Sequence, residues 1–352
     1  MKQLRLILCI LLFPLTVWYA VGVALRNMLY RKGILKSARP SVATISIGNL
    51  RMGGTGKTPH TEYLIRLFDN AGIKTALLSR GYGRSTHGYV LADTNSDATT
   101  LGDEPYMMSH KFPSLTTAVC EDRLEGLRQL SLLTDKPAMV LLDDAYQHRH
   151  LTPALNILLT EYSDLYCDDH ILPFGNLREA RHDSRRADII IVTKCPYTIS
   201  DSKREAIRKC LNPTPLQHLF FSFIEYAEPL PLYGNLSWSP VKEVLLVTGI
   251  ANPKPLKHHL ETRCTVHHIS FSDHHGFSDA NCRLIINRFN SMSEPSKAIV
   301  TTEKDAVRML TPEVRQKLKN LPLFFIPIKV NFFEDQEFDK TIMDFFTKFA
   351  HC

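Results

Sequence analysis

Residues 48–59, GNLRMGGTGKTP, decide the fold of this chain. They follow a β-branched run at residues 41–47, which predicts a buried strand, and precede residues 61–68, whose apolar side chains recur at helical spacing. A glycine-rich turn between a strand and a helix is typical of a phosphate-binding loop. The glycines let backbone amides turn toward an anion, and the helix N-terminus favours negative charge. The stretch therefore predicts a nucleotide-binding α/β fold.

The residues expected to hold the nucleotide lie within this loop. They are Gly53, Gly54, Thr55, Gly56, Lys57 and Thr58. Lys57 would reach the outer phosphates and the Thr58 hydroxyl would bind Mg²⁺. The usual GxxxxGK[ST] pattern has a glycine where this chain has Arg51, so the match is imperfect. A glycine-rich turn with a surface lysine, without nucleotide, is the alternative.

A pair of carboxylates, Asp143 and Asp144, follows the apolar run at residues 138–142. A buried strand that ends in a carboxylate, downstream of a phosphate loop, is where P-loop enzymes keep the acid on the magnesium side. We therefore expect ATP and Mg²⁺ as cofactors, with Thr58, Asp143 and Asp144 as the metal ligands. A solvated strand end is the alternative. Pro196 stands where a guanine-reading loop would carry aspartate, which favours adenine as the base.

The length of 352 residues is enough for two α/β domains. Strands alternate with helical stretches up to about residue 226, which indicates a mainly parallel sheet covered on both faces. A Pro- and Gly-rich stretch at residues 227–242 predicts a linker. The expected fold class is α/β, with a P-loop domain at residues 31–226 and a smaller C-terminal α/β domain at residues 243–352.

The N-terminal residues 6–25 are almost wholly apolar. A helix of that length spans about 30 Å, which matches the hydrocarbon core of a bilayer. More basic residues follow it than precede it, which places the rest of the chain in the cytosol. The run is long for a signal peptide and no small-residue cleavage site follows it. We expect a membrane-associated helix at residues 1–30; Pro14, Trp18 and Tyr19 leave open whether it crosses the bilayer or lies in its interface.

Charge and cysteine content narrow the remaining possibilities. The net charge of +6 does not by itself imply nucleic acid, and a solvated basic surface is its simplest explanation. Eight cysteines without CxxC spacing predict reduced thiols in the cytosol rather than a disulfide framework. His148 and His150 have the spacing of a metal pair, but no third ligand matches them, so zinc is not expected.

Beyond these features, the chain carries a series of motifs in a fixed order. After the apolar N-terminal segment come GNLRMGGTGKTPH, LLSRGYGR, GDEP, LLDDAYQHR, LPFGNLRE, RADIIIVTKCP, FSDHH and TTEKDAVRM. In this order they resemble the tetraacyldisaccharide 4′-kinase family of Gram-negative bacteria, and the resemblance covers nearly the whole chain. That family departs from the strict P-loop pattern at the same place.

The resemblance implies an ATP-dependent lipid kinase built from two Rossmann-like α/β/α domains, of which residues 31–226 would be the P-loop kinase domain. It would transfer the γ-phosphate of ATP to the 4′-hydroxyl of a tetraacyldisaccharide 1-phosphate in lipid A biosynthesis. It further implies a place at the bacterial inner membrane, with the active site on the cytoplasmic face. The expected partners are the lipid A disaccharide precursor and membrane lipid; no nucleic acid and no obligate protein partner are expected.

Residue roles follow from the same resemblance. Asp103 of GDEP would be the base for the attacking hydroxyl, and His274 of FSDHH would orient it as a dyad, with His275 left open as the partner. Lys57 completes the catalytic set. Substrate contacts are expected at Glu104, Gln147, His148 and Arg178. The arginines at residues 178–186 could clamp a phosphate.

Two other classes of function share these features. One is a membrane-bound P-loop ATPase that switches a partner protein, and the other is a nucleotide-binding subunit without turnover. A phosphorylated product that forms only with acceptor lipid distinguishes the kinase from both.

Overall fold

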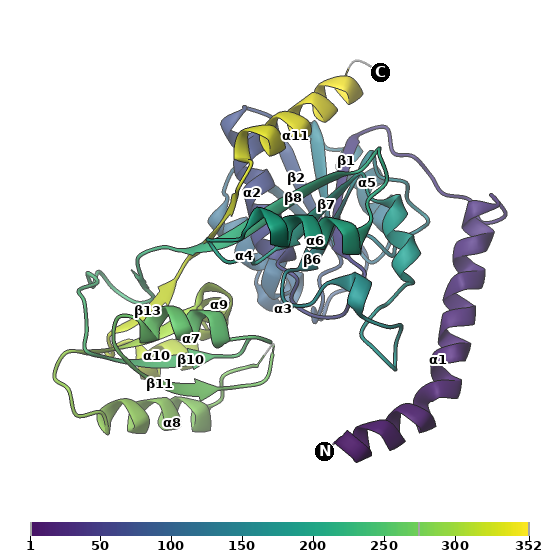
Figure 1. Ribbon diagram of the computed structural model, residues 1–352. Coiled ribbons are helices and arrows are strands. Elements are labelled where there is room, and N and C mark those ends of the chain that lie inside the picture. Colours follow the sequence, from purple (N-terminus) through teal and green to yellow (C-terminus); the bar gives the residue numbers. More distant parts are fainter. Residues whose placement is uncertain (1, 274, 351–352) are drawn as a thin grey trace. The chain divides into compact units, whose positions relative to one another are not determined.

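A computed structural model describes residues 2–273 and 275–350 of the chain, with side chains described from Pro14 onward as far as residue 349. It consists of two compact units. The first unit comprises Met1–Ile224 and Val330–Cys352, and the second comprises Glu225–Lys329. Figure 1 shows the strands and helices of each unit.

These boundaries differ from the expected ones in two respects. Residues 330–352 were expected in the C-terminal domain, but they belong to the first unit. Residues 227–242 were expected to be a plain linker, but they include β9 (Leu230–Pro231), an edge strand of the second sheet. Neither feature has a local sequence signal, because both depend on pairing with strands far away in the chain.

A nine-stranded sheet forms the centre of the first unit, in the order β14-β8-β7-β6-β1-β5-β2-β4-β3. Its strands are β1 (Ala43–Asn49), β2 (Thr75–Ser79), β3 (Val90–Leu91), β4 (Thr116–Val119), β5 (Met139–Asp143), β6 (Leu155–Glu161), β7 (Ile189–Thr193), β8 (His218–Tyr226) and β14 (Ile328–Phe332). The strands from β8 to β4 pair in parallel, and β3 joins β4 antiparallel. All residues of β1, β2 and β7 are buried, which explains their apolar and β-branched composition.

Helices accompany this sheet. They are α1 (Lys2–Arg31), α2 (Lys57–Asn70), α3 (Ala98–Leu101), α4 (Asp103–Lys111), α5 (Arg123–Ser131), α6 (Asp201–Leu211) and α11 (Asp335–Ala350), with the 3₁₀ turns η1 (Tyr166–Asp168) and η2 (Arg181–Arg186). The returning segment is anchored by aromatic packing. The rings of Phe332 in β14 and Phe338 in α11 stack 3.9 Å apart, and the Tyr63 hydroxyl of α2 donates to Asp339 Oδ1 at 2.7 Å.

The arrangement of the central strands positions the site. β1 lies between β5 and β6, with Ile47 opposite both Asp143 and Ile157. The chain thus leaves β1 toward one side of the sheet and later reaches its other side, which makes the carboxyl end of β1 a topological switch point. The glycine-rich loop, which we define as residues 50–56, therefore emerges beside the acidic pair at the end of β5.

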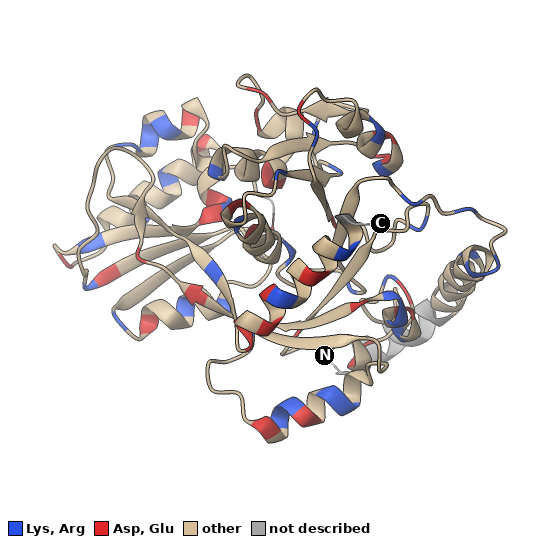
Figure 2. Cartoon of the chain, turned by 90° about the horizontal axis from the view of Figure 1, so that it is seen from above, with Lys and Arg blue, Asp and Glu red and all other residues tan. Residues whose placement is uncertain are grey.

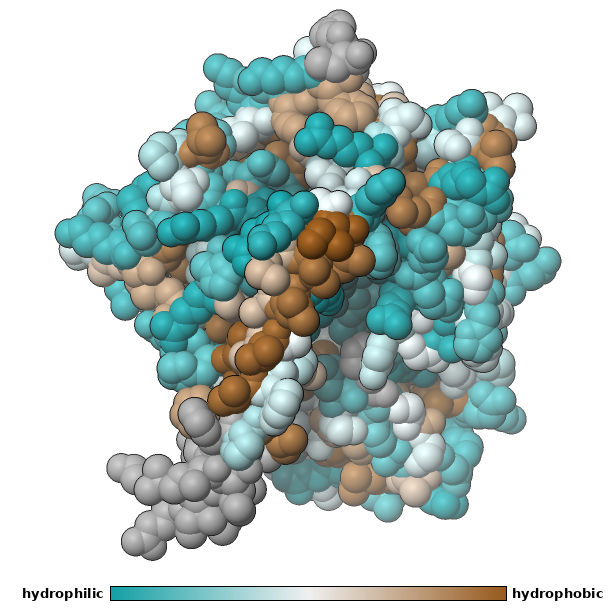
Figure 3. All heavy atoms as spheres, turned by 90° about the vertical axis from the view of Figure 1, so that its right-hand side faces the viewer, coloured by the Kyte–Doolittle hydropathy of each residue, from teal (hydrophilic) through white to brown (hydrophobic). Residues whose placement is uncertain are grey.

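Helix α1 is an elongated helix of 30 residues. Among the described residues, no helix meets the length and hydropathy required to cross a bilayer. Several large apolar side chains of α1 are exposed: Leu15, Val17, Trp18, Tyr19, Val21, Leu25 and Met28. Figure 3, which faces α1, shows a hydrophobic band running along the helix.

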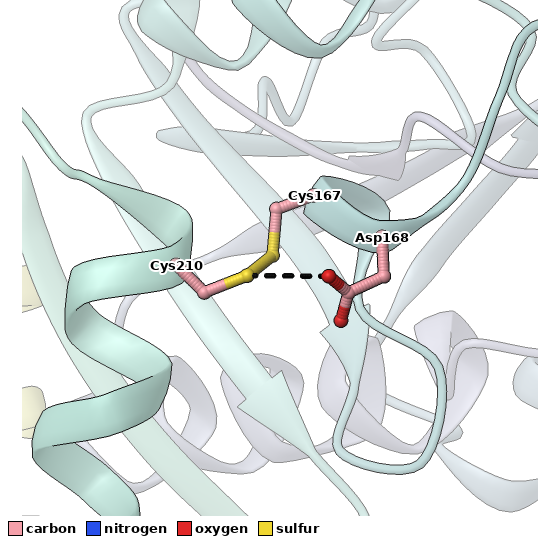
Figure 4. Close-up of side chains that lie close together, drawn as sticks. All are labelled: Cys167, Asp168 and Cys210. Carbon is pink, nitrogen blue, oxygen red and sulfur yellow. Dashed lines mark hydrogen bonds between the residues drawn. A yellow bond between two sulfur atoms is a disulfide. The ribbon is translucent and has the colours of Figure 1, made fainter.

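Two cysteines of the first unit form a disulfide, Cys167 with Cys210, at a Cα separation of 6.2 Å. Cys167 lies in η1 after β6, and Cys210 lies in α6 after β7, so the parallel pairing of β6 with β7 brings them together (Figure 4). Asp168 Oδ1 lies 3.6 Å from the Cys210 sulfur. The prediction of reduced thiols is wrong at these two positions. Their separation of 43 residues gave no spacing signal.

The second unit has its own five-stranded sheet, in the order β11-β10-β12-β13-β9. Its elements are β10 (Glu243–Thr248), α7 (Lys254–Glu261), β11 (Thr265–Ser270), α8 (Asp279–Asn290), β12 (Lys297–Thr302), α9 (Glu303–Met309), α10 (Pro312–Leu318) and β13 (Leu323–Ile326). The fully buried Asp305 accepts hydrogen bonds from the Gly249 amide at 2.9 Å and from Arg308 at 3.0 Å. The TTEKDAVRM motif thus ties the loop after β10 to α9.

Basic and acidic residues alternate along the helices (Figure 2), in keeping with the modest net charge of +6.

Candidate functional site

The glycine-rich loop ends at the start of α2. Gly56, the residue before the helix, has a φ of 90°, and Gly53 has a φ of 113°, conformations that a residue with a Cβ rarely adopts. Gly56 has no side chain to cap α2, and the first turn of the helix carries Lys57 and Thr58 without a carboxylate. The helix amides are therefore available to an anion, as the sequence predicts.

Three side chains hold the glycine-rich loop in place by hydrogen bonds. The Thr193 hydroxyl donates to the carbonyl oxygen of Thr55 at 2.8 Å, and Lys194 Nζ donates to that of Gly54 at 2.6 Å. Lys194 also pairs with Glu161 at 3.0 Å. Asn49 Nδ2 donates to the Thr55 hydroxyl at 2.7 Å. In the sequence, this stretch was compared only with a guanine-reading loop, which Pro196 argues against, so the support of the glycine-rich loop by Thr193 and Lys194 was not predicted.

Arg51, the residue that breaks the usual motif, points away from the loop centre. Its side chain is only 14% exposed and pairs with Asp164 and, at 3.0 Å, with Asp169. Both partners flank η1. Arg51 therefore anchors the start of the loop to the segment after β6, and a phosphate contact is not required to explain it.

The acidic pair faces the end of the loop. Asp144 has a φ of 45°, a left-handed conformation that aspartate tolerates better than most residues and that is found at functional sites. Its Oδ1 lies 3.7 Å from Lys57 Nζ. The Ser79 hydroxyl, at the end of β2, donates to Asp143 Oδ2 at 3.4 Å. A small cavity beside the pair is lined by Thr58, Thr61, Leu77, Ser79, Glu104, Pro105, Met108 and Asp143.

The two carboxyl groups have different protonation behaviour. Burial, reinforced by the charges of Glu104 and Asp144, raises the pKa of Asp143 to about 7. Burial alone would also raise the pKa of Asp144. The hydrogen bonds from Arg178 and the charge of Lys57 outweigh it, so the pKa of Asp144 is lowered. Asp144 therefore stays ionised at neutral pH, whereas Asp143 gains a proton readily unless positive charge is bound beside it.

Arg178 reaches the site from the loop after β6. It donates from Nη1 to Asp144 Oδ2 at 3.1 Å and from Nη2 to Asp144 Oδ1 at 2.9 Å. Nη2 also donates to Asn49 Oδ1. Gln147 joins the same group, because its Nε2 donates to the Asn49 carbonyl at 2.7 Å. Two residues predicted to contact substrate, Arg178 and Gln147, thus meet at the carboxyl end of β1.

Arg123 is a site residue that the sequence analysis missed. It is 3% exposed and donates to the carbonyl oxygens of Cys120 at 2.6 Å and of Asp143 at 3.1 Å. Burial lowers its pKa, while the charges of Asp143 and Asp144 act in the opposite direction. A single arginine at the start of a helix carries no motif, so only the fold reveals that it faces the acidic pair.

The remaining predicted residues lie in three places. Asp103 and Glu104 begin α4, after Gly102 with its φ of 88°. His148 follows the acidic pair, and burial lowers its pKa, helped by the charge of Arg123. His274 lies outside the described residues.

Two arginines of the 178–186 loop have partners within the protein. Arg181 donates to the Asp169 carbonyl at 2.8 Å, and Arg186 binds the buried Glu179. Arg181 and Arg186 are therefore engaged in contacts away from the acidic pair, whereas Arg178 contacts Asp144 beside the glycine-rich loop.

The donor set beside the loop suits a hard divalent cation. The Thr58 hydroxyl and the carboxylates of Glu104 and Asp143 line the same small cavity, and oxygen donors of this kind are what Mg²⁺ prefers. The Oδ1 atom of Asp143 is buried and finds no hydrogen-bond partner among the described residues. The described part of the chain also holds a cluster of Cys167, Asp168 and Cys210, but its two sulfurs are already bonded to each other.

Comparisons with known proteins show which family the chain is similar to. A sequence model of the family described as tetraacyldisaccharide-1-P 4′-kinase matches residues 8–347. The tetraacyldisaccharide 4′-kinase of Flavobacterium johnsoniae is 43% identical over 344 residues, which cover 95% of this chain and 96% of the relative. That of Bacteroides thetaiotaomicron is 44% identical over 343 residues, covering 93% and 90%. A crystal structure of the "apo" form of LpxK from Aquifex aeolicus in complex with ATP matches with a TM-score of 0.73 and 28% identity, over 96% of this chain and 99% of that chain.

Proposed function

Because the chain belongs to the tetraacyldisaccharide-1-P 4′-kinase family and is a kinase of lipid A biosynthesis, we propose that the site around Lys57, Asp144 and Arg178 carries out its phosphoryl transfer. The donor is ATP, and the acceptor is the 4′-hydroxyl of a tetraacyldisaccharide 1-phosphate. The contact of Arg178 with Asp144, beside the glycine-rich loop, is the observation that carries this assignment.

Positioning and charge neutralisation do most of the work in phosphoryl transfer. The amides at the start of α2 and the side chain of Lys57 bind the phosphates, and Lys57 is oriented by Asp144 3.7 Å away. The planar guanidinium of Arg178 forms an ion pair with the same carboxylate. In this position it stabilises the negative charge that spreads over the transferred group.

Mg²⁺ would be held by Thr58, Asp143 and Asp144, with Glu104 beside them. It supplies charge neutralisation to the phosphate oxygens when bound. Asp143 is suited to this role since its buried Oδ1 finds no protein partner among the described residues. Cation binding would release the proton that burial favours on Asp143.

Asp103 is proposed as the base that accepts the proton of the attacking 4′-hydroxyl, with His274 as its dyad partner. Asp103 begins α4 directly before Glu104, which lines the small cavity beside the acidic pair, and a positioned carboxylate can accept the proton of a reacting hydroxyl. His275 has partners inside the second unit: it stacks on Phe271 at 4.4 Å and contacts Asn281 at 3.0 Å. These contacts hold the His275 ring within the second unit.

Helix α1 is proposed to associate with the bacterial inner membrane, with the active site on the cytoplasmic side. Trp18 is 77% exposed and Leu15 is 58% exposed, so the helix presents a large apolar surface to its surroundings. Arg31, Lys32, Lys36 and Arg39 lie in or after its last turn, where they can meet anionic lipid headgroups. An enzyme held there shares a surface with its acylated substrate.

The reaction is tested with γ-labelled ATP, Mg²⁺ and the tetraacyldisaccharide 1-phosphate, followed by separation of the lipid. Label in the lipid, lost with Lys57→Ala and retained with the surface variant Lys257→Ala, supports the assignment. ATP hydrolysis without labelled lipid would overturn it in favour of an ATPase switch. Asp103→Asn should lower the rate by about 10²-fold or more if the carboxylate is the base.

Membrane association is tested by sedimentation with vesicles that contain anionic lipid. The double variant Trp18→Glu, Val21→Glu should stay in the supernatant. Leu216→Glu, at a residue 89% exposed elsewhere on the first unit, should sediment as the unaltered chain does. Equal sedimentation of all three proteins would contradict the role of α1.

A further inference from the structure

A buried polar cluster lies beneath the C-terminal turns of α1. Asn27 of α1 and Glu179 of the loop before η2 are both fully buried, and Asp183 of η2 is 4% exposed. Polar groups this deeply buried destabilise a fold unless they are hydrogen-bonded. Their bonding pattern therefore reports which parts of the protein must stay together.

The cluster joins α1 to Glu179 and Asp183. Asn27 Nδ2 donates to Glu179 Oε1 at 3.2 Å and to Asp183 Oδ2 at 3.1 Å. Arg26 Nη2 donates to Glu179 Oε1 at 2.6 Å, and Arg186 donates to its other oxygen. Glu179 thus has both oxygens satisfied, and α1 provides two of its three partners.

Glu179 directly follows Arg178, the arginine at the phosphate site. The backbone of Arg178 is held on both sides: its amide donates to the Leu50 carbonyl at 2.7 Å, and its carbonyl accepts from the Tyr19 hydroxyl at 3.0 Å. One bond comes from the glycine-rich loop and the other from α1. The position of the Arg178 main chain therefore depends on α1 as well as on the loop.

A second connection runs to the residues after the acidic pair. The Tyr146 hydroxyl donates to the carbonyl oxygen of Asp183 at 2.8 Å, and Arg186 lies 4.5 Å over the Tyr146 ring. Tyr30, in the last turn of α1, meets His150 edge-on at 5.5 Å. Arg178 and Asp144, which we propose to form the phosphate site, are thus both connected to the residues against which α1 packs.

We infer that Asn27 and Glu179 are positioning residues. Through their hydrogen bonds, the packing of α1 determines the position of the Arg178 guanidinium on Asp144. The inference rests on the proposed action of Arg178 in phosphoryl transfer. As a consequence, α1, whose outer face is apolar, also affects the geometry of the phosphate site. Weakening its contacts with the rest of the first unit should slow the reaction even when all catalytic groups are present.

The test compares kcat of full-length variants altered at the contacts of α1. The labelled-lipid assay measures kcat at saturating acceptor. Asn27→Ala and Glu179→Gln should lower kcat about tenfold, because a small misplacement of a positioned group is enough to slow a reaction. Tyr19→Phe, which removes one exposed hydroxyl, should lower it less. Ala24→Ser, at an exposed position of α1, should leave kcat unchanged.

A double-mutant cycle with Arg178→Lys separates positioning from general structural damage. If Asn27 acts through Arg178, the Asn27→Ala change should cost less than twofold once Arg178→Lys is present. An undiminished tenfold loss in that background would overturn the inference, as would unchanged kcat in both Asn27→Ala and Tyr19→Phe. Glu179→Gln may be omitted from the cycle if it does not fold, since the other two variants decide the outcome.

The same experiment distinguishes failure of the inference from failure of the proposed function. Full activity of Arg178→Lys and of Arg178→Ala would remove Arg178 from the mechanism and overturn both. Strong loss in Arg178→Ala together with additive effects at Asn27 would overturn the positioning role alone.

Discussion

Arg178 holds Asp144 with both arms of its guanidinium, from Nη1 to Oδ2 at 3.1 Å and from Nη2 to Oδ1 at 2.9 Å. The same carboxylate lies 3.7 Å from Lys57 Nζ. One aspartate therefore orients two cations toward the place where the glycine-rich loop and α2 would bind phosphate. The pKa of Asp144 is lowered in this setting, so the carboxylate remains charged as the reaction proceeds.

Arg178→Lys should lower kcat by about 10- to 100-fold, because lysine cannot make the paired contact that fixes the guanidinium plane. The labelled-lipid assay measures this loss. Arg185→Lys, an exposed arginine of η2, is the matched control and should be fully active. Equal activity of the two variants would show that the paired contact is not used.

Lys194→Ala should weaken ATP binding about tenfold, with little change in the rate at saturating ATP. The lysine ties the Gly54 carbonyl to Glu161 and so keeps the loop in its binding conformation before the nucleotide arrives. Titration with a fluorescent ATP analogue gives the affinity. Lys209→Ala, on the exposed side of α6, is the control and should bind ATP as the unaltered chain does. Identical ATP affinities of the two variants would show that Lys194 does not support the loop.

Gly48→Ala should destabilise the first unit by about 1–3 kcal/mol and reduce nucleotide binding, since overpacking a tight contact forces the backbone apart. A Cβ at Gly48 would lie 2.6 Å from the Tyr146 Cβ. Thermal unfolding measures the effect. Gly22→Ala in α1 is the control, because no described atom lies within 4 Å of its Cβ, and its stability should be unchanged or slightly higher. A stable, fully active Gly48→Ala protein would contradict this close approach.

The unfolding free energy should decrease as the pH falls from about 6.5 to 4, in part because of His60. Its Nδ1 lies 2.7 Å from the Gly56 carbonyl and its Nε2 lies 2.9 Å from the Ser222 hydroxyl, contacts that a neutral ring satisfies by donating at one nitrogen and accepting at the other. Burial lowers the pKa of His60 to about 4, and the charge of Lys194 acts in the same direction. The folded-state pKa lies below the unfolded value of 6.5. The contribution, about 3 kcal/mol at most, is therefore present above pH 6.5 and is lost toward pH 4.

His60→Asn should flatten this part of the pH profile, measured by denaturant unfolding without nucleotide or divalent cation. His218→Asn, at an exposed histidine, serves as the control and should retain the slope. An unaltered slope in His60→Asn would assign the acid sensitivity to other groups.

The part of the site that lies close together in the chain could be predicted from the sequence. The strand, loop and helix around residues 48–59 form one local unit, and the acidic pair ends an apolar strand, so hydrophobic periodicity and glycine positions were enough to locate both. Parallel pairing of β1 with β5 then explains why they meet.

The parts that depend on distant pairing could not be predicted. Asn27 and Glu179 are 152 residues apart in the sequence. No local pattern around either residue predicts that the two side chains form a buried contact. Thr193 and Lys194 were not predicted to contact the loop, because these contacts arise from the neighbouring positions of β6, β7 and β1. The disulfide and the return of β14 and α11 to the first sheet have the same origin.

The interruption of the first unit by residues 225–329 has a consequence for synthesis on the ribosome. The edge of its sheet at β8 is completed by β14, which is translated only after the entire second unit. During that interval a growing chain exposes an unpaired edge strand, a structure that invites pairing with other chains. Premature termination between residue 226 and the start of β14 at Ile328 would leave the same edge open. A nascent form of this protein thus needs protection, or a fast-folding insert, until its last two elements emerge.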